Sequence, residues 1–85
     1  MKVKVLYFAS LREQLGTPGE EIELPAGVGT VAALRSHLRG RGGAWELALA
    51  DGKLVRTALN QEMAPPMAAL KAGDEVAFFP PVTGG

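Results

Sequence analysis

Apolar and polar residues alternate at the start of the chain. Over residues 2–8, Val3, Val5 and Tyr7 fall on one side of an extended backbone, because successive side chains of a strand face opposite ways. The other side carries Lys2, Lys4, Leu6 and Phe8. This pattern predicts a strand that buries one face and leaves the other available.

The next segment predicts a short helix. Ser10 and Glu13 have the spacing of a capping box, with Ser10 as the N-cap and Glu13 three residues later. Leu11 and Leu15 lie four apart, so they share one face of a helix. Gly16 suits the position where a helix ends.

A second helix is predicted to start after Thr30, a good N-cap residue, and to run to about Leu38. Val31, Leu34 and Leu38 form its apolar stripe. A glycine-rich segment ends it. Residues 45–49 then form a short apolar segment whose pattern fits neither helix nor strand decisively.

The other predicted elements are strands. Residues 20–24 alternate, with Ile22 and Leu24 as the apolar positions. Further strands are predicted at residues 53–59, 62–63 and 75–79. The order of elements is strand, helix, strand, helix and then short strands, which favours an α+β fold with a helix across one face of a mixed sheet. We expect one domain over residues 1–79, followed by an extended tail over residues 80–85.

Composition excludes several classes of function. Nine basic residues balance nine acidic ones, which argues against nucleic acid or an anionic membrane as a partner. The chain has no cysteine, so disulfides, thiolate metal sites and a cysteine nucleophile are excluded. The sequence has no signal-peptide pattern and no apolar run of the roughly 20 residues that a membrane span needs. We therefore expect a cytoplasmic protein.

The tail has an unusual composition. Its residues are Pro80, Pro81, Val82, Thr83, Gly84 and Gly85. Two prolines cannot continue a sheet ladder, so the chain is expected to leave the sheet in an extended form. Glycines without side chains can enter a narrow channel, and six extended residues reach roughly 20 Å. The tail is therefore predicted to place the Gly85 carboxylate in the active site of another protein.

Apolar side chains near the start of this tail give a second signal. If the first and last strands are parallel neighbours, Phe8 and Phe79 lie at the same end of the sheet, on the face that the core does not need. Met63 is a candidate to join them, since methionine suits adaptable contact surfaces. Either a loop covers these side chains or they form an exposed patch for a partner protein.

Other candidate residues carry little functional signal. His37 is the only histidine and lies beside two arginines, without a second group that would make it a base or a ligand. The segment 40–43 lacks the spacing of a phosphate-binding loop. Trp45 is interpreted as an anchor of the core or of a loop, and the glutamates at 20, 21 and 23 as a solvated edge.

The C-terminal residues 73–85 resemble the signature of the MoaD family, the small sulfur-carrying subunits of molybdopterin synthase. Further matching pieces lie at residues 5–9, 47–54 and 60–61, so the resemblance spans the chain. One departure is the segment Ala64–Met67. The resemblance implies a ubiquitin-like β-grasp fold.

The resemblance also implies a reaction cycle. An E1-like adenylyltransferase would use ATP and Mg²⁺ to adenylate the Gly85 carboxylate, and a sulfurtransferase would then exchange AMP for sulfur. The carrier itself would bind no cofactor or metal and would catalyse nothing alone. Gly84 and Gly85 would enter the large subunit of molybdopterin synthase and donate sulfur to a pterin precursor. Phe8, Met63, Phe79, Pro80, Pro81, Val82 and Thr83 would contact that partner.

Three alternatives share parts of this pattern. A ubiquitin-like modifier would use the same tail to form an isopeptide bond with a lysine of a target protein. A carrier for thiamine thiazole synthesis would use the same activation, but its relatives usually lack the apolar segment before the glycines. A plain interaction module would have a chemically inert tail.

Overall fold

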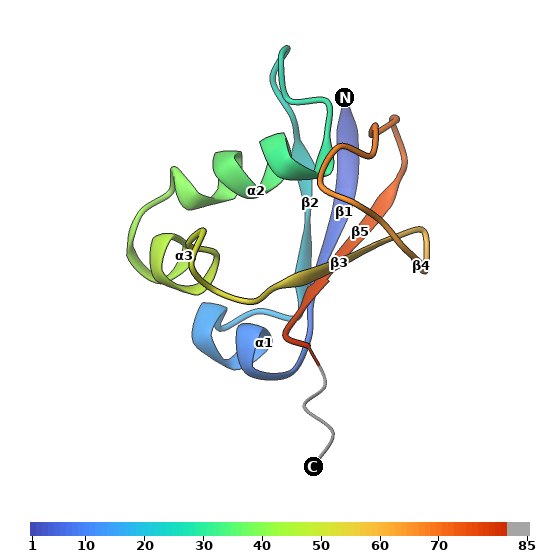
Figure 1. The fold of residues 1–85 in the computed structure, drawn as a ribbon. Coiled ribbons are helices and arrows are strands. Elements are labelled where there is room, and N and C mark those ends of the chain that lie inside the picture. The colour runs from blue at the N-terminus through green and yellow to red at the C-terminus, as the bar shows by residue number, and fades with distance from the viewer. Residues whose placement is uncertain (82–85) are drawn as a thin grey trace.

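The computed structural model describes residues 1–81 of the 85-residue chain (Figure 1). The described part contains three helices and five strands. In chain order these are β1 (Lys2–Tyr7), α1 (Ala9–Leu15), β2 (Gly19–Glu23), α2 (Val31–Arg39), α3 (Gly43–Ala48), β3 (Arg56–Leu59), β4 (Glu62–Met63) and β5 (Glu75–Phe79).

The five strands form one mixed sheet in the order β2-β1-β5-β3-β4. The central pair, β1 and β5, is parallel, whereas the other pairs are antiparallel. All three helices lie on one side of this sheet (Figure 1). The predicted α+β class, the mixed sheet of a β-grasp and the parallel pairing of the first and last strands are confirmed.

The core lies between the sheet and the helices. Val3, Val5 and Tyr7 are each at most 1% exposed, which confirms the alternation predicted for β1. The stripe predicted for α2 is confirmed as well, because Leu34 and Leu38 are completely buried. Buried apolar side chains of this kind contribute about 1.5–3 kcal/mol each, so they carry most of the stability of a small domain.

The two predicted helix caps have different outcomes. The hydroxyl of Thr30 accepts a hydrogen bond from the Ala33 N–H at 3.1 Å, as predicted for the start of α2. The capping box at Ser10 is wrong: α1 starts at Ala9, and the N-cap residue Phe8 makes no side-chain cap. The cause is that β1 and its pairing with β5 hold the chain up to Phe8, so the backbone turns into the helix before Ser10.

Residues 43–59 also differ from the prediction. The apolar segment of undecided type is a helix, α3, which packs Ala48 and Leu49 into the core. Strand β3 covers only the last four residues of the predicted range 53–59, because residues 51–53 turn and lead into it. No helix within residues 1–81 is long and apolar enough to cross a membrane.

Candidate functional site

The end of β5 is placed by its pairing with β1. Tyr7 lies opposite Phe78 in the parallel ladder, and the Phe8 N–H donates a hydrogen bond to the Phe78 carbonyl at 3.1 Å. Phe8 therefore follows the register to a position beside Phe79, where β5 ends. The structure brings these two aromatic residues to the same end of the sheet.

Both residues belong to the face of the sheet that no helix covers. Phe8 is 45% exposed, and Met63 is 59% exposed. Phe79, Pro80 and Pro81 are partly buried. We call these five residues the exit surface. Val82, Thr83, Gly84 and Gly85, the other predicted site residues, lie outside the described residues.

An apolar row crosses this uncovered face. Leu6 pairs with Ala77, Ala77 with Ala58, and Ala58 with Met63, so these four side chains share one face of four adjacent strands. Met63 lies two strands away from Phe79, on the same face. The row was not predicted from the sequence, although the alternation of β1 placed Leu6 on this face.

Gly19 extends the row onto β2, opposite Leu6. A Cβ atom at this position would lie 2.7 Å from the Val5 carbonyl oxygen and 2.9 Å from a Leu6 methyl group. These distances are shorter than normal contacts, so the close approach of Leu6 requires a glycine.

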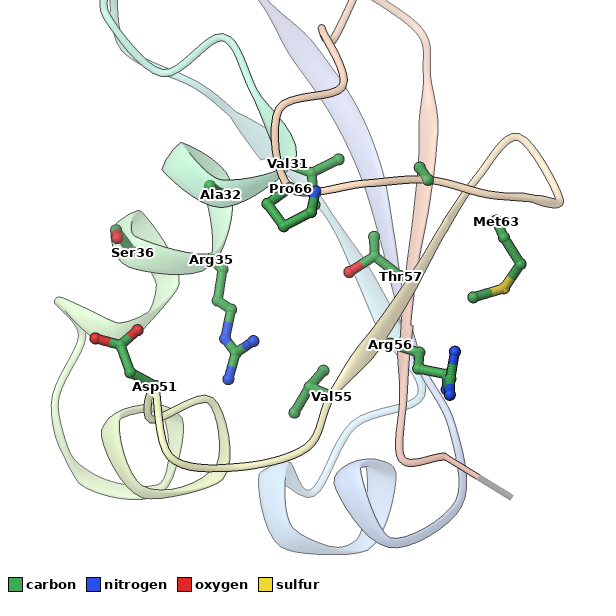
Figure 2. Close-up of a pocket in the computed structure, with 11 residues that line it drawn as sticks. Val31, Ala32, Arg35, Ser36, Asp51, Val55, Arg56, Thr57, Met63 and Pro66 are labelled. Atoms are coloured by element: carbon green, nitrogen blue, oxygen red, sulfur yellow. The ribbon is translucent and has the colours of Figure 1, made fainter. Parts of the chain in front are cut away.

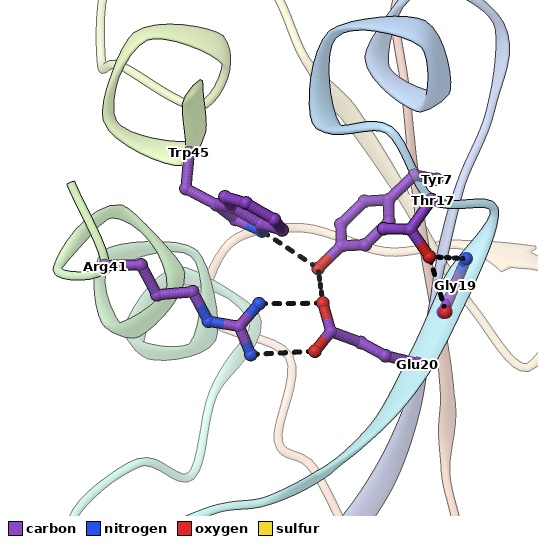
Figure 3. A network of polar contacts seen from close by, with 6 residues as sticks. All are labelled: Tyr7, Thr17, Gly19, Glu20, Arg41 and Trp45. Atoms are coloured by element: carbon purple, nitrogen blue, oxygen red, sulfur yellow. Dashed lines mark hydrogen bonds and ion pairs between the residues drawn. The ribbon is translucent and has the colours of Figure 1, made fainter. Parts of the chain in front are cut away.

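The helix-covered face carries a polar network instead, which we call the polar clamp (Figure 3). Glu20 accepts two hydrogen bonds from the Arg41 guanidinium, both at 2.8 Å, and a third from the Tyr7 hydroxyl at 3.0 Å. Trp45 Nε1 donates to the Tyr7 oxygen at 3.3 Å. The Arg41 guanidinium carbon lies 5.1 Å from the centroid of the Trp45 ring, a cation–π distance.

Sequence reasoning placed Glu20 on a solvated edge, and this interpretation is wrong. Glu20 pairs with Val5 across the ladder and so shares the helix-covered face with Tyr7. The sequence gives one signal for this position. Glu20 lies two residues before the buried Ile22, so both side chains face the same side of β2. Glu21 and Glu23 are exposed as expected.

The pKa shifts of Glu20 and Tyr7 fit a structural role of the polar clamp. The Arg41 guanidinium holds the pKa of Glu20 below its ordinary value of 4.5. Burial raises the pKa of the Tyr7 phenol to about 12. At neutral pH the carboxylate is therefore charged and the phenol keeps its proton, which fits hydrogen-bonded anchors better than a proton-transfer pair.

The part of the chain that the structure describes contains no group of three or more His, Asp or Glu side chains that could hold a metal ion. His37 is exposed near the C-terminal end of α2. The candidate site is the exit surface, where large apolar side chains are exposed at the end of β5.

Comparisons with known proteins agree with this geometry. Residues 5–85 match the model of the ThiS family. The chain is 51% identical to the molybdopterin synthase sulfur carrier subunit of Escherichia coli, over 98% of this chain and 99% of that protein.

Two solved structures have the same fold. The small archaeal modifier protein 1 of Haloferax volcanii superposes with a TM-score of 0.77 at 31% identity, covering 95% of this chain and 98% of that one. The complex of subunits 1 and 2 of the molybdopterin-converting factor from Helicobacter pylori contains a chain with a TM-score of 0.68 at 27% identity, with both chains fully covered. The protein thus belongs to the ThiS family, the MoaD/ThiS group of sulfur carriers that its C-terminal signature resembles.

Proposed function

We propose that this protein is the sulfur carrier subunit of molybdopterin synthase in molybdenum cofactor biosynthesis. The observation that carries the proposal is the identity of 51% to a sulfur carrier subunit over almost the whole of both chains. The carrier is a co-substrate, and the large subunit supplies the catalytic pocket. Its residues 1–79 form the body that stays outside this pocket, and residues 80–85 form the tail that enters it.

The chemistry of the tail requires activation. A carboxylate is a poor electrophile, so the Gly85 carboxylate first attacks ATP, held with Mg²⁺ by an E1-like adenylyltransferase, and pyrophosphate leaves. A sulfurtransferase then delivers sulfur, AMP leaves, and Gly85 carries a thiocarboxylate. The chain contains no cysteine that could capture the acyl-adenylate. We infer that this cycle takes place in the cytoplasm.

The exit surface supports docking on the large subunit. Its exposed Phe8 and Met63 are large apolar side chains that a partner would cover. The relative from Helicobacter pylori is found in a complex of subunits 1 and 2. In this arrangement Phe8, Met63, Phe79, Pro80 and Pro81 contact the large subunit, Val82 and Thr83 line the entry to its pocket, and Gly84 and Gly85 reach the substrate.

A second candidate function is protein modification. The similarity to small archaeal modifier protein 1 favours it, since that protein has the same fold at 31% identity. A modifier would join Gly85 to a lysine of a target protein. The two functions share the activation step and differ in the acceptor of the acyl group.

Intact-mass spectrometry of the full chain separates these functions. The protein is incubated with the adenylyltransferase, ATP, Mg²⁺ and a sulfur donor, and then with the large subunit and a pterin precursor. We expect a gain of about 16 Da, the difference between sulfur and oxygen, which disappears when the dithiolene forms. Larger adducts in cell extracts without this gain would favour the modifier.

Deletion of Gly85 is the matched control. We expect the deletion to abolish sulfur transfer and to leave the melting temperature unchanged, because the buried core lies within residues 1–79. Full dithiolene synthesis by the shortened chain would contradict the proposal.

A further inference from the structure

A groove with a volume of about 390 Å³ lies between α2 and β3 (Figure 2). Val31 and Arg35 of α2 line it, together with Thr57 of β3 and Pro66 of the loop after β4. The Arg35 guanidinium lies in the space between the helix and the strand (Figure 2). The volume falls within the range of roughly 300–1,000 Å³ that is typical of ligand pockets.

Arg35 has a fixed position in this groove. Its Nε donates to the Leu49 carbonyl at 2.8 Å, and its Nη2 donates to the carbonyls of Ala50 and Lys53 at 2.6 and 3.1 Å. These bonds hold the loop between α3 and β3 against α2. A preorganised positive charge therefore lies beside the groove and loses little conformational entropy when an anion binds.

The groove includes Val55, the residue just before β3 begins. The Asn60 N–H donates a hydrogen bond to the Glu75 carbonyl of β5. In this antiparallel ladder the even-numbered residues of β3 therefore point their N–H and C=O groups toward β5, and the odd-numbered residues point theirs toward β4. On that other side, β4 pairs only with Ala58 and Leu59, and the Ala64 N–H reaches the Thr57 carbonyl at 3.0 Å. In the described residues the ladder ends there, and Val55 lies beyond it.

Charge on both sides of this edge is positive. Thr57 faces the helices together with Arg35, whereas Arg56 belongs to the opposite face with Phe79 and Met63. The one acidic side chain of the groove, Asp51, already forms an ion pair with Arg39 at 2.8 Å. Two arginines therefore remain, one for each face of a strand added here.

We propose that this groove binds an extended acidic segment of a partner protein, which pairs with the backbone of Val55, where the ladder between β3 and β4 ends. Side chains of an added strand alternate between the two faces of the sheet. Acidic side chains on the helix-covered face would therefore contact Arg35, and those on the opposite face would contact Arg56. Apolar residues between them would contact Val31 or Met63, which lie on the two faces of the same groove.

This site goes beyond the proposed sulfur transfer and does not involve the tail. Its failure would leave the sulfur carrier proposal intact, because the experiment below measures binding without activation, sulfur or the large subunit.

The full chain, labelled with nitrogen-15, is titrated with a blocked hexapeptide of alternating glutamate and valine and followed by NMR. We expect the largest amide shifts at Val55, Arg56 and Thr57, and a shift of the Arg35 Nε–H. Replacing Arg56 by glutamate should weaken binding about tenfold, which corresponds to about 1.4 kcal/mol. Arg12→Glu is the matched control, since Arg12 is an exposed arginine on α1 and should leave the affinity unchanged.

A second peptide, with lysine in place of glutamate, tests the role of charge. We expect it to bind at least about tenfold more weakly than the acidic peptide. The proposal would be overturned if both peptides bound equally well, or if the Arg56 and Arg12 variants lost the same affinity. Amide shifts confined to residues outside the groove would overturn it as well. The absence of any shift at Val55 and Thr57 would overturn it too.

Discussion

The two faces of the sheet use the same strands in opposite ways. On the helix-covered face, Tyr7 is buried, and its hydroxyl both donates and accepts a hydrogen bond. On the uncovered face, the next residue, Phe8, is 45% exposed and continues an apolar surface. Polar groups are thus satisfied where the chain packs on itself, and apolar groups remain open where it can pack on another protein. This difference leads us to propose that the covered face serves stability and the uncovered face serves recognition.

Truncation of the core is the strongest test of this division. Leu34 is completely buried under the helix-covered face, so Leu34→Ala should lower the free energy of unfolding by about 2–5 kcal/mol. Urea denaturation followed by circular dichroism measures this loss. A much smaller loss would mean that the covered face does not carry the stability.

A substitution on the uncovered face should change binding to a partner more than it changes stability. Phe79→Ala should weaken binding to the large subunit by more than about 1 kcal/mol, as expected for an aromatic anchor. It should cost much less stability than Leu34→Ala, because Phe79 is only partly buried. Calorimetric titration and urea denaturation of the same variant test both parts. Unchanged affinity would show that the exit surface is misplaced.

The polar clamp should give a smaller effect on stability. Tyr7→Phe removes one donor and one acceptor but keeps the ring, so it should cost about 1 kcal/mol. The pKa of Tyr7 is raised to about 12, so the folded state favours the protonated phenol. Its contribution is complete below the ordinary value of 10.0 and is lost as the pH rises through about 12.

Unfolding measured from neutral pH to about pH 12 should therefore show a weaker alkaline loss in Tyr7→Phe than in the original chain. The affinity for the large subunit should not change, because this side chain lies on the covered face. An identical alkaline loss in both proteins would contradict the role of Tyr7.

Glu20 gives the smallest expected effect, at acid pH. Its pKa is lowered, chiefly by hydrogen bonds from Arg41, so its contribution is present above 4.5 and is lost as the pH falls through the lowered value. Glu20→Gln should remove part of the acid sensitivity measured by urea denaturation between neutral pH and about pH 3. Glu21→Gln is the control, since Glu21 is exposed on the same strand. Equal effects of the two substitutions would rule out this role.

Local patterns predicted most of the fold. Alternation identified β1 and β2, and the stripe with its Thr30 cap identified α2, because each depends on neighbours a few residues apart. Ser10 shows the limit of such patterns. Its capping signal was overridden by the hydrogen bond between Phe8 and Phe78, which joins residues from opposite ends of the chain.

Nonlocal contacts also explain what the sequence did not reveal about the site. Helix α3 has six residues and follows a glycine-rich segment, so its periodicity is too short to recognise. The polar clamp joins Tyr7, Glu20, Arg41 and Trp45, whose spacing in sequence carries no motif. Phe8 and Phe79 were nominated because the parallel pairing of their strands could be anticipated, whereas the open edge at Val55 depends on how far β4 extends.

The polar clamp has a practical consequence. Trp45 is the only tryptophan of the chain, and its ring lies against the Arg41 guanidinium. Its intrinsic fluorescence therefore comes from a single, known place in the fold. Opening of the clamp should change this emission without any added label, whereas a protein that docks on the bare side of the sheet should leave it almost constant.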